Sequence, residues 1–113
     1  MSGMKSKRSK ACDISKVVKD AVWERDEQRC IICHSLHAAP NAHYIRRSRG
    51  GLGIEQNIVT LCGGCHRQFD SGTAEGQAWM GMQIKAYLKS CYDDWKEEDL
   101  IYWRDRQCLT ISQ

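Results

Sequence analysis

Apolar residues recur along this chain at two spacings, and these spacings divide it into predicted helices and strands. In residues 14–28 they fall every three or four positions, which predicts an amphipathic helix. Residues 42–45 and 58–61 are short β-prone runs, and the interval between them suits neither a crossover helix nor a tight turn. We predict a hairpin with a wide glycine-rich loop, preceded by a loop over residues 34–41, which contain Pro40.

The second half of the chain is predicted to be mainly helical. Residues 66–70 fit one to two helical turns, and residues 73–92 and 95–106 fit two further helices. Asp94 with Glu97 forms a capping box for the last of them. Three aromatic side chains at helical spacing are expected to lie in the core rather than to stack on bases: Trp79, Trp95 and Trp103.

The length and composition indicate one folded domain. The chain has 113 residues, of which 42% are hydrophobic and 27% charged, an ordinary globular balance. It has no apolar run near the roughly 20 residues that a membrane span needs and no signal-peptide core, so we expect a cytoplasmic protein without membrane partners. Residues 1–11 are predicted to be a disordered basic arm, and residues 12–113 a single domain.

The charge is unevenly distributed. The formal net charge is +3, but the first ten residues carry four basic side chains and no acidic ones. The rest of the chain is therefore slightly acidic. Any phosphate-binding surface in the domain must be a local patch rather than a property of the whole chain.

Four of the seven cysteines form two pairs of equal spacing. Within each pair two residues separate the thiols, which lets both sulfur atoms face one ion, and two such pairs complete a tetrahedral site for zinc. Disulfides and a redox CxxC motif are the alternatives, although a redox motif needs only one pair. The paired cysteines are Cys30, Cys33, Cys62 and Cys65. The other three, Cys12, Cys91 and Cys108, are interpreted as small apolar residues.

Further motifs lie between and beside the cysteine pairs. They read AHYI over residues 42–45, RSRGG over 47–51, NIVTLC over 57–62 and CH over 65–66. In these motifs the chain resembles the HNH, or His-Me finger, endonucleases, and most of all their small phage and prophage members with a double CxxC zinc knuckle. The resemblance implies a small α+β fold. Its core, residues 30–72, would be a ββα-metal motif on a treble-clef-like four-cysteine zinc knuckle, with N-terminal helices before it and C-terminal helices over residues 73–106 after it.

The resemblance also implies roles for individual side chains. His43 would be the general base, Asn57 would brace the loop around it, and His66 would hold a catalytic divalent ion. Asp70 lies four residues after His66 and shares its helical face, so the two side chains suit Mg²⁺ or Mn²⁺, with Ni²⁺ or Zn²⁺ as further options. The simpler interpretations are a surface histidine at 43, a turn-forming asparagine at 57, and a solvated or capping aspartate at 70.

Two positions depart from the family pattern. Ala42 stands where relatives often have a metal-ligating Asp or His, so another residue such as Asn41 or His37 would have to reach the ion, or activity would be weak or absent. Arg46 stands where relatives commonly have proline. With Arg47 and Arg49 it forms a basic patch suited to DNA phosphates, although an arginine run is also typical of a solvated loop.

The sequence therefore predicts a metal-dependent DNA endonuclease in which His43 activates a water that attacks the phosphodiester. The products implied by the resemblance carry a 5′-phosphate and a 3′-hydroxyl. The alternative is a catalytically weak or inactive zinc-knuckle module that binds DNA or protein. Phage terminase and portal proteins are the implied partners, and the cytoplasm of a bacterial host is the implied location.

Overall fold

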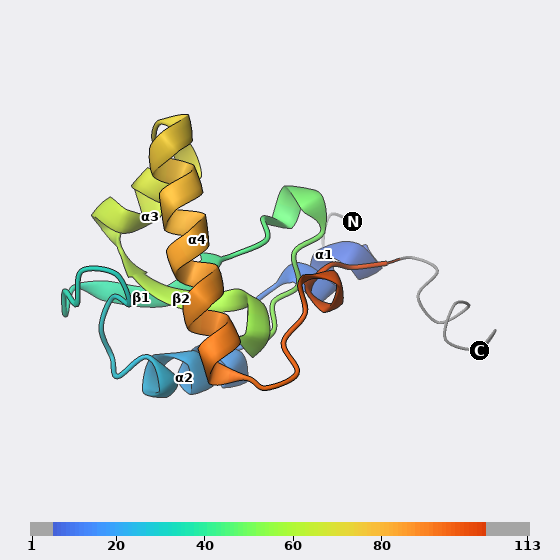
Figure 1. The fold of residues 1–113 in the computed structure, drawn as a ribbon. Helices are drawn as coiled ribbons and strands as arrows, with labels where there is room; N and C mark the ends of the chain where they lie inside the picture. Colours follow the sequence, from blue (N-terminus) through green and yellow to red (C-terminus); the bar gives the residue numbers. More distant parts are fainter. Residues whose placement is uncertain (1–5, 104–113) are drawn as a thin grey trace, which may run out of the picture.

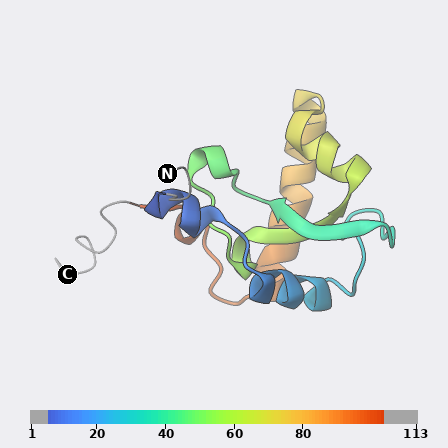
Figure 2. The same ribbon diagram turned by 180° about the vertical axis from the view of Figure 1, so that it is seen from behind.

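The computed structural model describes residues 6–103, in which helices surround a two-stranded hairpin (Figure 1). The α-helices are α1 (Lys7–Cys12), α2 (Lys16–Arg25), α3 (Gly63–Ser71) and α4 (Ala74–Cys91), and the strands are β1 (Ala38–His43) and β2 (Ile58–Cys62). Short 3-10 helices are η1 (Arg47–Arg49), η2 (Glu55–Asn57) and η3 (Glu97–Leu100). From behind, the hairpin lies in front of α4, so α4 covers one of its faces (Figure 2). The molecule is a small α+β domain.

Strand β2 is buried on both faces. It pairs antiparallel with β1, with Ala38 opposite Cys62 and His43 opposite Ile58. Side chains alternate along a strand, so Val59 and Leu61 face one way and pack into a cluster with α3 and α4. That cluster consists of Cys30, Ala42, Val59, Leu61, Phe69, Met80, Ile84 and Leu88. The core therefore joins the hairpin to α4 and includes one of the paired cysteines.

An ionic network joins α2 to the hairpin and to α4. The Thr60 backbone N–H donates to Asp26 Oδ2 at 2.8 Å, and the Tyr87 hydroxyl donates to Asp26 Oδ1. Arg25 donates to the same carboxylate at 2.7 Å and to the Ile58 carbonyl at 2.7 Å. Burial tends to lower the pKa of Arg25, but the hydrogen bond to Asp26 outweighs it and raises that pKa. The two charges are thus paired with each other and hydrogen-bonded to both β2 and α4.

The wide loop after β1 is held closed by one buried side chain. The Asn57 amide accepts from the Ile45 backbone N–H at 2.8 Å and donates to the carbonyls of Ile45 at 3.1 Å and Leu52 at 2.8 Å. Residues 100–102 run alongside the loop, and Gly51 and Ile101 form an isolated antiparallel bridge. Gly50 has a φ of 85°, a left-handed conformation that favours glycine.

The N-terminal segment is more ordered than the sequence predicts. Residues 7–12 form α1, capped by the Ser6 side chain, where the sequence predicts disorder; residues 1–5 of the predicted arm lie outside the described part. Arg8 donates to the Ser48 carbonyl at 2.9 Å, and the Gly53 N–H donates to the Ala11 carbonyl at 3.0 Å. These contacts with the wide loop fix a segment whose composition alone favours disorder.

Two predicted boundaries are wrong. The predicted loop over residues 34–41 is in part strand, because β1 begins at Ala38 and includes Pro40. The pairing is irregular between Ala39 and Ala42, and at such an irregularity a proline does not cost a ladder hydrogen bond. In the last predicted helix, residues 95–106, the described part holds only η3, whose cap residue Lys96 makes no side-chain capping bond. Residues 104–106, like Cys108, lie outside the described part.

The tryptophans are only partly in the core. Trp95 packs against Tyr44, with ring centroids 5.9 Å apart, whereas Trp79 and Trp103 are 52% and 51% exposed. Helix α4 instead buries Met80, Ile84 and Leu88, which follow one another at four-residue intervals. No helix within residues 6–103 is long and apolar enough to span a membrane.

Candidate metal centre and adjoining cavity

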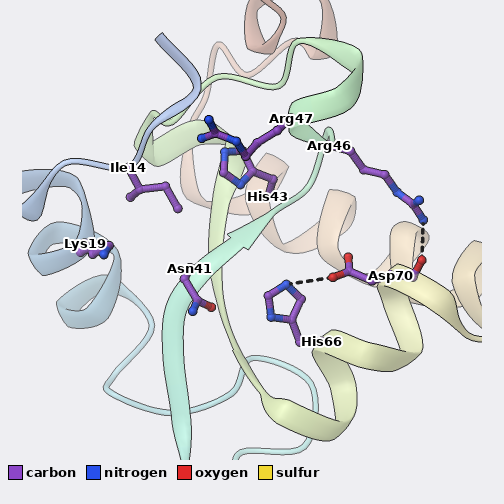
Figure 3. A pocket seen from close by; sticks show the side chains of 8 residues that line it. All are labelled: Ile14, Lys19, Asn41, His43, Arg46, Arg47, His66 and Asp70. Atoms are coloured by element: carbon purple, nitrogen blue, oxygen red, sulfur yellow. Dashed lines mark hydrogen bonds and ion pairs between the residues drawn. The ribbon is translucent and has the colours of Figure 1, made fainter. Parts of the chain in front are cut away.

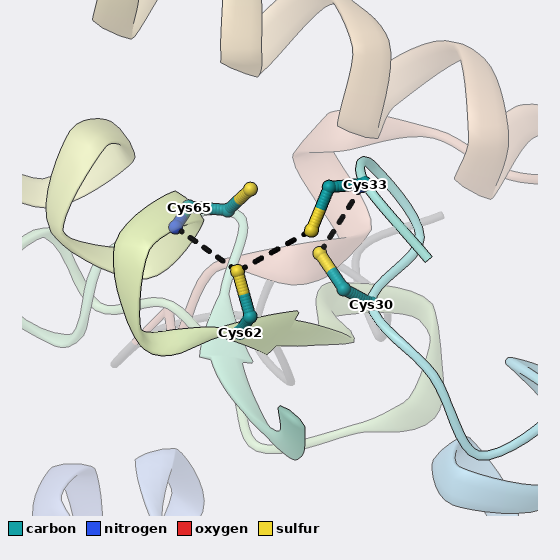
Figure 4. A group of neighbouring side chains, drawn as sticks. All are labelled: Cys30, Cys33, Cys62 and Cys65. Atoms are coloured by element: carbon teal, nitrogen blue, oxygen red, sulfur yellow. Dashed lines mark hydrogen bonds between the residues drawn. The ribbon is translucent and has the colours of Figure 1, made fainter. Parts of the chain in front are cut away.

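The four paired cysteines come together at one point of the surface (Figure 4). Cys30 and Cys33 lie on the turn before β1, Cys62 ends β2, and Cys65 is in the first turn of α3. All four Sγ atoms lie within 4.8 Å of one another. Thiolates about 2.3 Å from a shared tetrahedral ion would be separated by about 3.8 Å, so the cluster has the size of a single-ion site.

Backbone amides point at the sulfur atoms. The Cys33 N–H donates to Cys30 Sγ at 3.5 Å, and the Cys65 N–H donates to Cys62 Sγ at 3.4 Å. The Cys33 and Cys62 sulfur atoms lie 3.5 Å apart, well beyond the roughly 2.05 Å of a disulfide, and all four cysteines are free thiols. The thiols are therefore free and arranged as ligands.

The electrostatics of the cluster favour a bound cation. Burial raises the pKa of the Cys30 thiol, but backbone amide hydrogen bonds outweigh this effect and bring its pKa down to about 7. Burial and the neighbouring thiols raise the pKa of Cys65. The Cys30 thiolate thus forms readily while the Cys65 thiol resists ionisation, and a bound cation would displace the remaining thiol protons.

A cavity of about 500 Å³ lies between α2, β1 and α3 (Figure 3). His43 projects into it from β1, and His66 and Asp70 project from α3 with His66 Nε2 3.3 Å from Asp70 Oδ2. The other lining residues are Ile14, Lys19, Asn41, Arg46 and Arg47. The structure thus brings the two predicted histidines, Asp70 and two of the three predicted arginines to one cavity.

The His43 ring is fixed by the N-terminal segment. Its Nε2 lies 2.9 Å from the Cys12 carbonyl oxygen, which accepts a hydrogen bond from it. Nε2 therefore carries the proton, and in the neutral ring Nδ1 is unprotonated. Burial lowers the pKa of His43; the Cys12 carbonyl opposes this shift, and the charges of Arg47 and His66 add to it. The ring is therefore held neutral in a positive field.

The remaining predicted site residues lie around this cavity rather than in it. Asn57 is fully buried under the wide loop, and Arg49 is exposed on η1 and does not line the cavity. The Ala42 side chain is buried in the core cluster, so a ligating side chain at that position would point away from the cavity. Asn41 and His37 both line a second, neighbouring cavity, and Asn41 lines the first as well.

Comparison with known proteins draws attention to a pattern around the cysteines. A family model described as "Doubled CXXCH motif" matches residues 24–71. The chain carries this motif twice. The two copies read CIICH over residues 30–34 and CGGCH over residues 62–66.

One curated relative matches part of this chain. The chain is 33% identical over 48 residues to Anaredoxin from Nostoc sp. (strain PCC 7120 / SAG 25.82 / UTEX 2576), a match that covers 42% of this chain. It spans 63% of Anaredoxin, less than two thirds of that protein. No solved structure matches the chain.

These comparisons overturn the identification as an HNH endonuclease. The matching family model is a doubled CXXCH motif and the relative bears the name of a redox protein; neither is an HNH nuclease. The prediction of a DNA-cleaving hydrolase is therefore wrong, and the alternative of a zinc-knuckle binding module is not supported either. The error comes from interpreting His43, Asn57 and His66 as a catalytic set. Any hairpin followed by a helix places residues at these three positions, whether or not they are catalytic.

The predicted cofactors are corrected as well. A CXXCH pattern indicates haem attachment, not structural zinc, and catalytic Mg²⁺ or Mn²⁺ has no support. Within residues 6–103 the four cysteines are the one group of three or more potential metal ligands. His66 and Asp70 therefore have no third His, Cys, Asp or Glu ligand grouped with them.

The geometry does not fit two haems. A c-type haem bonds both thiols of its own motif, and the following histidine ligates its iron. Here the thiols of both motifs lie within 4.8 Å of one another, so a haem bonded to one pair would occupy the space of the other. The four sulfur atoms fit one shared metal ion instead.

The doubled motif was visible in the sequence. A histidine directly follows the second cysteine of each pair, His34 in the first and His66 in the second. The sequence interpretation used His66 and left His34 out. The contributions of Lys19 and Ile14 to the cavity, by contrast, depend on how α2 packs and carry no sequence signal. DNA, phage proteins and a cytoplasmic location stay predictions.

Proposed function

We propose that this chain is a small electron-transfer protein whose redox centre is one iron ion held by Cys30, Cys33, Cys62 and Cys65. The observation that carries the proposal is the convergence of four free thiols within 4.8 Å. Sulfur ligands in a tetrahedral arrangement select zinc or iron, and the similarity to a protein named as a redoxin favours the ion that changes oxidation state.

The chain's own residues suit this role. Cys30 is fully buried whereas Cys33 is exposed, so the centre would be anchored in the core and would still reach the surface. When bound, the iron would supply a one-electron ferric–ferrous couple. Amide hydrogen bonds from Cys33 and Cys65 to the sulfur atoms would stabilise the reduced, more negative state and so raise the reduction potential.

We propose further that the two cysteine turns, the hairpin and α3 together form a treble-clef-like knuckle around this ion. Each turn contributes two ligands. One turn precedes β1, and the other lies at the junction of β2 and α3. The rigid hairpin between them fixes the ligand positions. Little rearrangement would then accompany a change of oxidation state.

The test is reconstitution of the purified chain with ferrous iron under reducing conditions, followed by metal analysis and visible spectroscopy. We expect one iron per chain, ferric–thiolate absorption that dithionite bleaches and air restores, and loss of both in Cys33→Ser. Cys91→Ser, which changes a thiol outside the cluster, is the matched control. Redox-silent binding of iron, or a covalently attached haem in the pyridine haemochrome assay, would overturn the proposal.

A further inference from the structure

A groove of about 540 Å³ lies next to the cysteine cluster. Leu61 and Gly63, which flank Cys62 in the chain, both line it, together with Trp23, Leu36 and His66. The Leu36 side chain is 70% exposed. The surface nearest the ligands is therefore hollow and partly apolar.

This groove continues into the cavity beside it. Asn41 and His66 line both hollows, and the cavity adds Lys19, Arg46 and Arg47 with Asp70 as its one acidic lining residue. Arg47 pairs with Asp13 at 3.0 Å, whereas Arg46 donates to the Phe69 and Asp70 carbonyl oxygens, which leaves its charge uncompensated by those contacts. The rim of the joined surface is thus basic (Figure 3).

Arg67 adds a further cation at the cysteine end. Its guanidinium lies 3.6 Å from the point where a Cβ on Gly63 would stand, so it folds back over the start of α3. Gly63 lies between two ligands of the candidate centre, Cys62 and Cys65. We use the name docking face for the surface made by Lys19, Trp23, Leu36, Arg46, Arg47 and Arg67.

We propose that the docking face binds an acidic one-electron carrier protein. This inference rests on the proposed function, since it assigns a partner to the same centre. A carrier in its reduced state would give one electron to the ferric ion, which becomes ferrous, and no proton or bond is transferred. Charge complementarity argues for an acidic partner, because cations on the rim steer a negatively charged protein toward the sulfur ligands.

The mixture of apolar and basic groups favours a protein over a nucleic acid. A phosphate backbone is recognised mainly by cations and hydrogen-bond donors, whereas Leu36 and Trp23 offer apolar contact in the groove next to the cysteine cluster. Small interfaces with a few apolar contacts and a charged rim are typical of transient electron-transfer complexes. The docking face has this composition.

The test uses a purified [2Fe–2S] ferredoxin of net negative charge as the probe. Its reduced form is mixed with the oxidised, iron-loaded chain in a stopped-flow instrument at a series of salt concentrations. We expect Lys19→Glu and Arg67→Glu each to lower the second-order rate constant about tenfold at low salt, with the difference disappearing at high salt. Lys89→Glu, the same charge reversal on α4 at a residue that lines neither hollow, should leave the rate near that of the parent chain.

Separate measurements distinguish the failure of this inference from failure of the proposed function. The iron content and the ferric–thiolate absorption spectrum report on the centre itself and should be unchanged in all three variants. An intact centre whose reduction by ferredoxin ignores Lys19→Glu and Arg67→Glu would overturn the docking face alone, as would tighter binding to a fluorescent DNA duplex than to the ferredoxin. If no redox-active centre forms, both proposals are wrong.

Discussion

At the scale of single residues, two neighbouring buried polar side chains have opposite consequences for stability. Asn57 is fully buried and uses its amide in three hydrogen bonds to the backbone of the wide loop. Thr60 is equally buried, yet its hydroxyl oxygen has no hydrogen-bond partner within the described residues. Burial of a polar group is favourable only where its hydrogen bonds are made.

We expect Asn57→Ala to lower the free energy of unfolding by about 2–4 kcal/mol, because it leaves a backbone N–H and two carbonyls of the loop without a partner. Urea denaturation followed by circular dichroism measures the change. Thr60→Val is the matched control, and it should cost nothing or stabilise by up to about 1 kcal/mol. Equal losses in the two variants would contradict the role assigned to Asn57.

At the scale of elements, the helices and strands with clear periodicity were predictable and their contacts were not. The spacing of apolar residues correctly placed α2 and α4, and the β-prone run over residues 58–61 located β2, whereas the run over residues 42–45 overlaps only the last two residues of β1. It did not reveal that Trp79 lies outside the core, because that depends on which side of α4 meets the hairpin. Nor did it reveal the position of Asp26, whose partners Thr60 and Tyr87 lie more than 30 residues away in the sequence.

Asp26 holds three elements together, so its removal should be more costly than that of any one partner. We expect Asp26→Asn to lower the free energy of unfolding by about 3–5 kcal/mol, because it leaves the half-buried Arg25 guanidinium without its counter-charge. Tyr87→Phe, which removes only one bond to the same carboxylate, should cost about 1 kcal/mol. Chemical denaturation compares the two. Similar values for both would show that the ionic network matters less than the packing around it.

At the scale of the whole molecule, the fold and the candidate centre depend on each other. Four cysteines from two distant turns can meet only when the hairpin has formed, and Cys30 is itself part of the apolar core. The spacing of the cysteines was enough to predict that the four thiols come together. The choice of zinc was wrong, and it could not be tested by spacing, since zinc and iron accept the same tetrahedral sulfur ligands.

Loss of the ion should therefore destabilise the entire domain. We expect Cys62→Ser, or treatment of the loaded protein with a strong chelator, to lower the melting temperature by about 10 °C or more, because a small core gains much of its stability from bound metal. Differential scanning calorimetry with parallel metal analysis measures this. Cys91→Ser should keep both metal and melting temperature. A metal-free Cys62→Ser protein that melts with the parent would show that the core is stable without the ion.

The crossing of two chain segments at Gly53 limits how this architecture can vary. A methyl group on Gly53 would stand 2.0 Å from the Asp13 carbonyl oxygen, so the wide loop touches the N-terminal segment there backbone to backbone. A relative with any side chain at this position could not keep both segments where they are. Its first helix would have to lie farther from the wide loop. The His43 ring, which donates to the Cys12 carbonyl, would then lose its acceptor. Glycine at position 53 is thus a marker for chains that share this N-terminal arrangement.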